Sequence, residues 1–241
     1  LPDTIAESMF GRERELMSPL RTLVIADANG EIRNTLLVPQ GELRAPIWLP
    51  NNQILFVTIA GNVSRLKVVA ATLTDVPRDF GGKPIGGTAP HFAPHGQTIV
   101  FLQRTKILSA NLAGTKIVPL IQNKAVNHIL GVFPDADPKI DNLIFTGKQP
   151  GRQWVAKIQG TKVLSVKRLP YDSRWALLNQ IQFHGERMLY EHQDAINNRK
   201  IWKIYLSQTP QAEGVPITTG LFNSRYPAWS PDGAKIIYAS E

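Results

Sequence analysis

The stretch Tyr226-Pro-Ala-Trp-Ser-Pro-Asp-Gly-Ala-Lys-Ile-Ile-Tyr-Ala-Ser-Glu241 decides the fold, because its pattern recurs along the chain. It joins an aromatic residue, a Pro/Gly turn and a short apolar strand that closes on a second aromatic. Clear copies are Ala45-Pro-Ile-Trp-Leu-Pro-Asn-Asn-Gln-Ile-Leu-Phe56 and Ala89-Pro-His-Phe-Ala-Pro-His-Gly-Gln-Thr-Ile-Val-Phe101; weaker ones run from Val132 to Phe145 and from Gln182 to Tyr190. The closing aromatics are Phe56, Phe101, Phe145, Tyr190 and Tyr238, at steps of 45, 44, 45 and 48 residues. A fixed period of about 40–45 residues is typical of one four-stranded blade of a β-propeller.

The strand count predicts how many blades there are. Each copy supplies two strands around its turn, and a hairpin such as Trp154–Ile158 with Lys162–Val166 supplies two more. The chain begins out of phase, with Thr22–Asp27 and Ile32–Val38 as the second half of a blade, and it stops after the first half of another. The sequence therefore predicts an all-β propeller of five four-stranded antiparallel blades, with six blades as the alternative. The last blade is expected to be closed by both chain termini, which removes an open sheet edge.

The chain is predicted to form one propeller domain over residues 21–241, preceded by an N-terminal arm over residues 1–20. No apolar run is long enough for a transmembrane helix, which needs roughly 20 residues. No cleavable signal peptide is visible, because charged residues interrupt residues 1–20. The chain opens on Leu1 and is expected to be a processed or trimmed product. The absence of cysteine excludes disulfides, thiol nucleophiles and Cys-ligated zinc.

The chain carries a formal net charge of +8, but its basic residues are dispersed. No run of five or more Lys and Arg residues exists among the 27 in the sequence. This pattern favours a generally basic surface over a specific nucleic-acid site. Weak attraction to acidic polysaccharide or membrane headgroups stays open.

The segment Trp229-Ser-Pro-Asp-Gly233, with the apolar strand that follows it, resembles the WD-like repeat of the TolB-like β-propeller family. The likeness covers the chain from about residue 21 to its end. It implies a periplasmic scaffold that binds protein partners. The chain departs from the six blades and the extra N-terminal domain of the TolB type, so the likeness implies only a general binding platform. Asp232 is predicted to form the turn and Gly233 to supply a positive φ.

The sequence offers little sign of catalysis. Some five-bladed propellers are glycoside hydrolases, which need two carboxylates facing each other in the central funnel. The aromatics directly before the turns of the five motif copies are Trp48, Phe92, Phe133, Phe183 and Trp229. The residues four positions before them are expected to line that funnel, and none is acidic: Arg44, Thr88, Ile129, Asn179 and Arg225. The five histidines lack metal-ligand spacing, although His91 and His128 are each expected to be able to approach the channel. Gly81-Gly82-Lys83 lacks the order of a phosphate-binding loop. We predict no catalytic residue, no metal and no cofactor.

A ligand site is predicted in the funnel, lined by Arg44, Thr88, His91, Asn179 and Arg225. Such a ring is polar and cationic and suits an acidic side chain or a carboxylate. The predicted function is that of a non-enzymatic scaffold that binds a protein or peptide through its funnel and loop face, in an extracytoplasmic bacterial setting. The alternatives are a carbohydrate-binding or carbohydrate-active propeller, and a propeller module of a larger enzyme.

Overall fold

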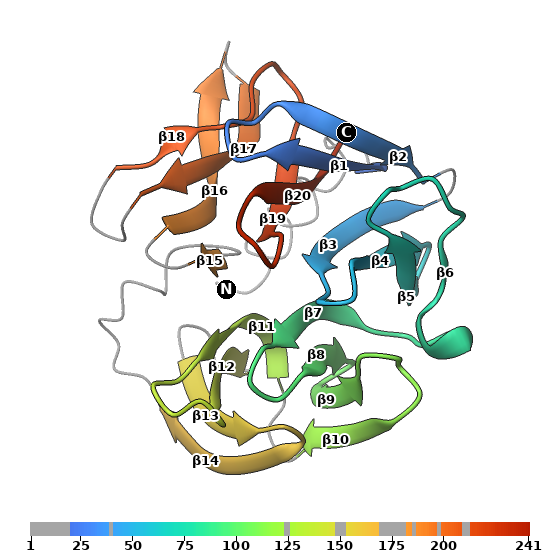
Figure 1. Ribbon diagram of the computed structural model, residues 1–241, viewed down its shortest axis with the longest axis vertical. Coiled ribbons are helices and arrows are strands. Elements are labelled where there is room, and N and C mark those ends of the chain that lie inside the picture. Colours follow the sequence, from blue (N-terminus) through green and yellow to red (C-terminus); the bar gives the residue numbers. More distant parts are fainter. Residues whose placement is uncertain are drawn as a thin grey trace, which may run out of the picture.

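The described part of the chain forms a five-bladed β-propeller. The structure is a computed structural model that describes residues 20–38, 41–122, 126–147, 153–168, 182–184, 187–196, 199–208 and 213–241. Twenty strands in these residues form five four-stranded antiparallel sheets around a common centre (Figure 1). The predicted five-bladed all-β fold is thus confirmed, and the six-bladed alternative is wrong. The N-terminal arm predicted for residues 1–20 lies outside the described residues except for Leu20.

We number the blades I to V and give the strands of each from the centre outward. Blade I contains β19 (Ser224–Trp229), β20 (Lys235–Ser240), β1 (Thr22–Asp27) and β2 (Ile32–Leu37). Blade II contains β3 (Glu42–Trp48), β4 (Gln53–Ala60), β5 (Val63–Ala70) and β6 (Arg78–Asp79), followed by a 3-10 helix, η1 (Phe80–Gly82). Blade III contains β7 (Thr88–Ala93), β8 (Thr98–Gln103), β9 (Lys106–Asn111) and β10 (Ile117–Ile121). Blade IV contains β11 (Val126–Pro134), β12 (Asp141–Gly147), β13 (Gln153–Gln159) and β14 (Lys162–Arg168). Blade V contains β15 (Gln182–His184), β16 (Arg187–Ile196), β17 (Arg199–Ser207) and β18 (Val215–Pro216).

Blade I combines segments that are far apart in the sequence. Strand β1 pairs with β20 over its whole length, from Thr22 opposite Ser240 to Asp27 opposite Lys235. Figure 1 shows the blue and dark red strands side by side in one sheet. The backbone hydrogen bonds of this pair join blade I into one sheet.

The hydrophobic core lies between the blades. In β4, Ile54 and Phe56 pack against blade I, whereas Leu55 and Val57 pack against blade III. Successive side chains of a strand point to opposite faces, so a strand buried between two neighbouring sheets is apolar throughout. The same rule explains the apolar runs in β8, β12 and β20. The closing aromatics Phe56, Phe101 and Phe145 are fully buried in these seams.

The motif turn of blade I is built from its own side chains. Asp232 accepts hydrogen bonds from the Ser230 hydroxyl at 2.6 Å and from the Ala234 backbone N–H at 3.0 Å, and Gly233 has a φ of 66°. Arg187 of blade V donates to the carbonyl of Gly233 at 2.9 Å. Asp232 is therefore a turn-forming residue, as predicted, and the turn ties blade I to blade V.

Candidate functional site

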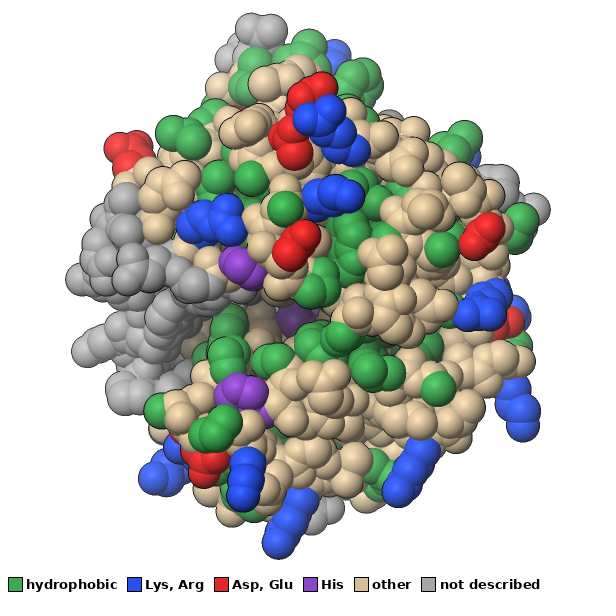
Figure 2. All heavy atoms as spheres, in the orientation of Figure 1, with side chains coloured by type: hydrophobic (Ala, Val, Ile, Leu, Met, Phe, Trp, Pro, Cys, Tyr) green, Lys and Arg blue, Asp and Glu red, His purple; other side chains and the backbone are tan. Residues whose placement is uncertain are grey.

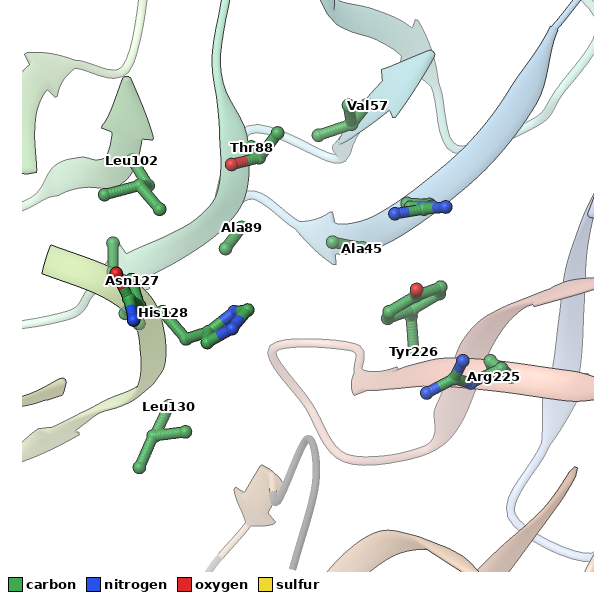
Figure 3. A pocket seen from close by; sticks show the side chains of 12 residues that line it. Ala45, Val57, Thr88, Ala89, Leu102, Asn127, His128, Leu130, Arg225 and Tyr226 are labelled. Carbon is green, nitrogen blue, oxygen red and sulfur yellow. The ribbon is translucent and has the colours of Figure 1, made fainter. Parts of the chain in front are cut away.

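The inner strands surround a cavity of about 370 Å³. Its walls come from β3, β7, β11 and β19, the inner strands of blades II, III, IV and I, with additions from β4 and β8 (Figure 3). The lining residues are Arg44, Ala45, Val57, Thr88, Ala89, Leu102, Asn127, His128, Ile129, Leu130, Arg225 and Tyr226. Tyr226 and His128 project into it from opposite sides. The cavity therefore offers polar groups and aliphatic surface to one small ligand group.

A repeated β-bulge shapes three of the inner strands at the cavity. In β3, Arg44 faces Val57 and Ile47 faces Leu55, so two residues of β3 lie opposite one residue of β4. Strands β7 and β19 show the same register shift. The first bulged residue is Ala45, Ala89 or Tyr226, with a φ of 47°, 47° or 58°, and a proline follows each of them in the sequence. Bulges of this kind redirect neighbouring side chains, and here they lie at the cavity wall.

The structure brings three of the five predicted site residues to the cavity wall: Arg44, Thr88 and Arg225. Asn179 lies outside the described residues. His91 is not among the lining residues and is only 4% exposed. Its position opposite Val100, which packs between blades III and IV, directs it into that seam. Burial lowers the pKa of His91 to about 4, against a smaller opposing effect of a hydrogen bond with the Ile129 backbone.

Glu42 binds the guanidinium of Arg44. Arg44 Nε donates to Oε1 at 2.8 Å and Nη2 donates to Oε2 at 2.7 Å, which is a bidentate contact. The two side chains are 34% and 27% exposed, Arg44 first. This hydrogen bond is the largest cause that raises the pKa of Arg44 above its usual value. The two side chains can meet although both come from β3, because residues two positions apart on a strand point to the same side of the sheet.

Glu191 binds the second guanidinium from the neighbouring blade. It comes from β16 of blade V, and its Oε2 accepts from Nε and Nη2 of Arg225 at 3.2 and 2.9 Å. Its Oε1 accepts from the backbone N–H of Tyr226 at 2.5 Å. Burial raises the pKa of Glu191, and the charge of Arg225 opposes this shift. Arg225 also lies over the Trp202 ring at 4.4 Å.

These contacts change the predicted character of the wall. The sequence predicts a cationic ring, whereas the structure shows two arginine–glutamate pairs. In each pair the negative charge of the glutamate offsets the positive charge of the arginine. Sequence reasoning missed both glutamates. Glu42 stands two residues before Arg44, a spacing that could have suggested the pair. Glu191 gives no such sign, because its partner is 34 residues away in another blade.

Other features of the described residues bear on the predicted partners. They contain no group of three or more His, Cys, Asp and Glu side chains that could hold a metal ion. Within the same ranges, no helix is long and apolar enough to cross a membrane. On the face drawn in Figure 2, Lys and Arg side chains are spread over several blades instead of forming one patch. This distribution agrees with the dispersed basic surface that the sequence predicts.

Comparisons with known proteins give structural likenesses at low sequence identity. No family model matches the chain, and no curated protein matches it either. A structure of the nidogen/laminin complex contains a chain with 16% identity and a TM-score of 0.52, over 90% of this chain and 84% of that one. A putative TolB from Agrobacterium tumefaciens has 13% identity and a TM-score of 0.47, over 92% of this chain and 98% of that one.

A further similar structure is the β-propeller domain of the trilobed protease from Pyrococcus furiosus. It has 12% identity and a TM-score of 0.42, and the match covers 78% of this chain. This chain spans 60% of the length of that one. At such low identities a likeness shows a shared fold alone, and of these three structures the nidogen/laminin chain has a TM-score above 0.5.

Proposed function

We propose that this propeller is a non-enzymatic binding platform whose central cavity receives an acidic side chain of a protein or peptide. The loop face around the cavity contacts the rest of the partner. The observation that carries the proposal is that Arg44 and Arg225 line one cavity and that, among the described residues, Nη1 of each has no hydrogen-bond partner. The sequence likeness to TolB-like propellers supports a use of this kind and an extracytoplasmic, periplasmic setting.

The unused donors of the two arginines suit a carboxylate. A guanidinium has five N–H donors in a fixed plane. Arg44 and Arg225 each use Nε and Nη2 toward their glutamates, and in the described part of the chain no hydrogen bond engages Nη1 of either residue. A carboxylate oxygen accepts such charge-assisted N–H bonds strongly. The Thr88 hydroxyl and the Asn127 amide add neutral donors on the other walls.

The aliphatic part of the lining suits the rest of an acidic residue. Leu102 and Leu130 form apolar wall on the side of the cavity away from Arg225 (Figure 3), and Ile129 also lines the cavity. The methylene groups of a glutamate can pack on this surface. The cavity of about 370 Å³ lies near the lower end of the usual ligand-pocket range of roughly 300–1,000 Å³. It therefore fits a single side chain better than a whole peptide, and the rest of the partner must bind outside it.

A carbohydrate-binding propeller is the second candidate function. The observation that favours it is the Tyr226 ring, which lies in the same cavity as the Asn127 amide and the His128 imidazole. An apolar ring face beside hydrogen-bonding groups suits a sugar ring, which has both C–H and hydroxyl surfaces. This candidate uses the same cavity, so one set of experiments separates the two.

The test is an NMR titration of ¹⁵N-labelled protein with two matched probes, N-acetyl-glutamate α-amide and N-acetyl-glutamine α-amide. We expect the acidic probe to shift the signals of Ala45 and Ala89 and to bind about tenfold more tightly than the amide, a difference of about 1.4 kcal/mol. Arg44→Gln should remove this preference. Equal binding of the two probes would contradict the proposal. Shifts of the same signals by a panel of simple sugars, without shifts by the acidic probe, would support the carbohydrate candidate instead.

A further inference from the structure

Glu42 occupies the edge of Arg44 that a ligand carboxylate would use. The pair has the side-on bidentate geometry that a guanidinium forms with any carboxylate, at 2.7 and 2.8 Å. Arg44 is at the same time a lining residue of the cavity, whereas Glu42 is not. The carboxylate of Glu42 therefore already binds the guanidinium that, in the proposed function, binds a carboxylate of the partner.

Little in the structure holds Glu42 in this place. Within the described residues, both of its carboxylate oxygens bond to Arg44 and to no other donor. Its side chain is 27% exposed, so the carboxylate can regain water when it leaves the guanidinium. Ion pairs that solvent reaches contribute little net stability, because hydration offsets the attraction between their charges. Replacement of the Glu42 carboxylate at Arg44 by the carboxylate of a ligand therefore costs little free energy.

We infer that Glu42 is an internal competitor that sets how tightly the cavity holds an acidic group, which makes it a specificity-determining residue of this site. The inference rests on the proposed function. An incoming carboxylate meets the negative charge of Glu42 if it binds beside it, and must displace it if it takes the side-on edge. Both routes weaken binding. The cavity then releases isolated acidic groups and retains those on a partner that also contacts the loop face.

The experiment repeats the two titrations with Glu42→Gln. This change removes one negative charge and keeps the size of the side chain. We expect the acidic probe to bind the variant about threefold to fivefold more tightly than the wild type, the effect of one weak ion pair. The amide probe should bind both proteins equally. Glu31→Gln is the matched control, because Glu31 pairs with Arg33 at the same spacing, on the outer part of blade I and outside the cavity lining.

The outcomes distinguish the inference from the proposed function. If the wild type prefers the acidic probe and Glu42→Gln holds it no more tightly, the inference is overturned and the proposed function stands. If Glu42→Gln tightens both probes, the cavity has changed shape, and competition by charge is wrong. If neither protein prefers the acidic probe, the proposed function fails and the inference fails with it. An equal gain in Glu31→Gln would assign the effect to net charge and also overturn the inference.

Discussion

Two arginine–glutamate pairs stand at the cavity, and they differ in how the glutamate is held. Glu191 has no exposed side-chain surface, comes from a neighbouring blade and accepts three hydrogen bonds. Glu42 is 27% exposed, lies on the same strand as its arginine and accepts two. The same two residue types thus form a fixed contact in one place and an exchangeable contact in the other.

The difference follows from what else each glutamate contacts. Glu191 binds the backbone N–H of Tyr226, a residue with a φ of 58° that an L-amino acid adopts reluctantly. Its carboxylate therefore stabilises the bulge of β19 as well as the guanidinium of Arg225. In β3 the bulged residue is Ala45, and no glutamate binds its backbone in the described part of the chain. We conclude that Glu191 maintains the wall of the cavity, whereas Glu42 modulates its charge.

The largest expected effect is that of removing the fixed partner. Glu191→Ala should lower the free energy of unfolding by about 4 kcal/mol, because it leaves a mostly buried guanidinium and the Tyr226 N–H without their acceptor. Urea unfolding followed by circular dichroism measures the change. A loss below about 1 kcal/mol would show that the two pairs are equivalent, contrary to the comparison. Arg225→Ala is the complementary variant, and it should lose a similar amount because it strands the buried carboxylate.

The next largest effect is expected at His91, and it appears only at acidic pH. Its folded-state pKa of about 4 lies below the usual 6.5, so the unfolded chain binds a proton more readily. His91 therefore adds no penalty above pH 6.5, and it destabilises the fold progressively as the pH falls from 6.5 to 4. The loss over this window amounts to about 3 kcal/mol at 1.36 kcal/mol per pKa unit. Between pH 6.5 and 4, the free energy of unfolding of His91→Gln should fall by this amount less than that of the wild type. An unchanged pH dependence would contradict the lowered pKa of His91.

Much of the fold follows from the spacing of a few residues. The closing aromatics from Phe56 to Tyr238 predict five blades, because one of them recurs in each sheet. Phe56, Phe101, Phe145 and Tyr238 are buried in the seams beside their own sheets. The same alignment predicts that Arg44, Thr88, Ile129 and Arg225 occupy equivalent places, and all four line the cavity. Equivalent positions on the inner strands meet at the centre of the propeller. The alignment of the repeats therefore predicts all four lining residues together.

The rest depends on contacts that a repeat pattern does not contain. Glu191 lies on the second strand of its blade and reaches Arg225 across a seam, so counting along the inner strands does not find it. His91 lies three residues beyond Thr88, and a strand rises by roughly 3.3 Å per residue. That distance moves His91 from the cavity into the closed seam between blades III and IV. Depth along the strand, which periodicity does not report, separates the two positions.

The smallest expected effect is that of removing the exchangeable partner, and it is the most direct check on the comparison. Glu42→Ala should change the free energy of unfolding by less than about 1 kcal/mol, because both side chains of the pair reach solvent and hydration replaces the contact. The difference from the wild type should shrink further in about 1 M salt, where the Debye length is only about 3 Å. Urea unfolding at low and high salt, beside Glu191→Ala under the same conditions, gives both numbers. A loss of about 2 kcal/mol or more that persists in salt would mean that Glu42 is as fixed as Glu191. It could not then yield Arg44 to an incoming carboxylate.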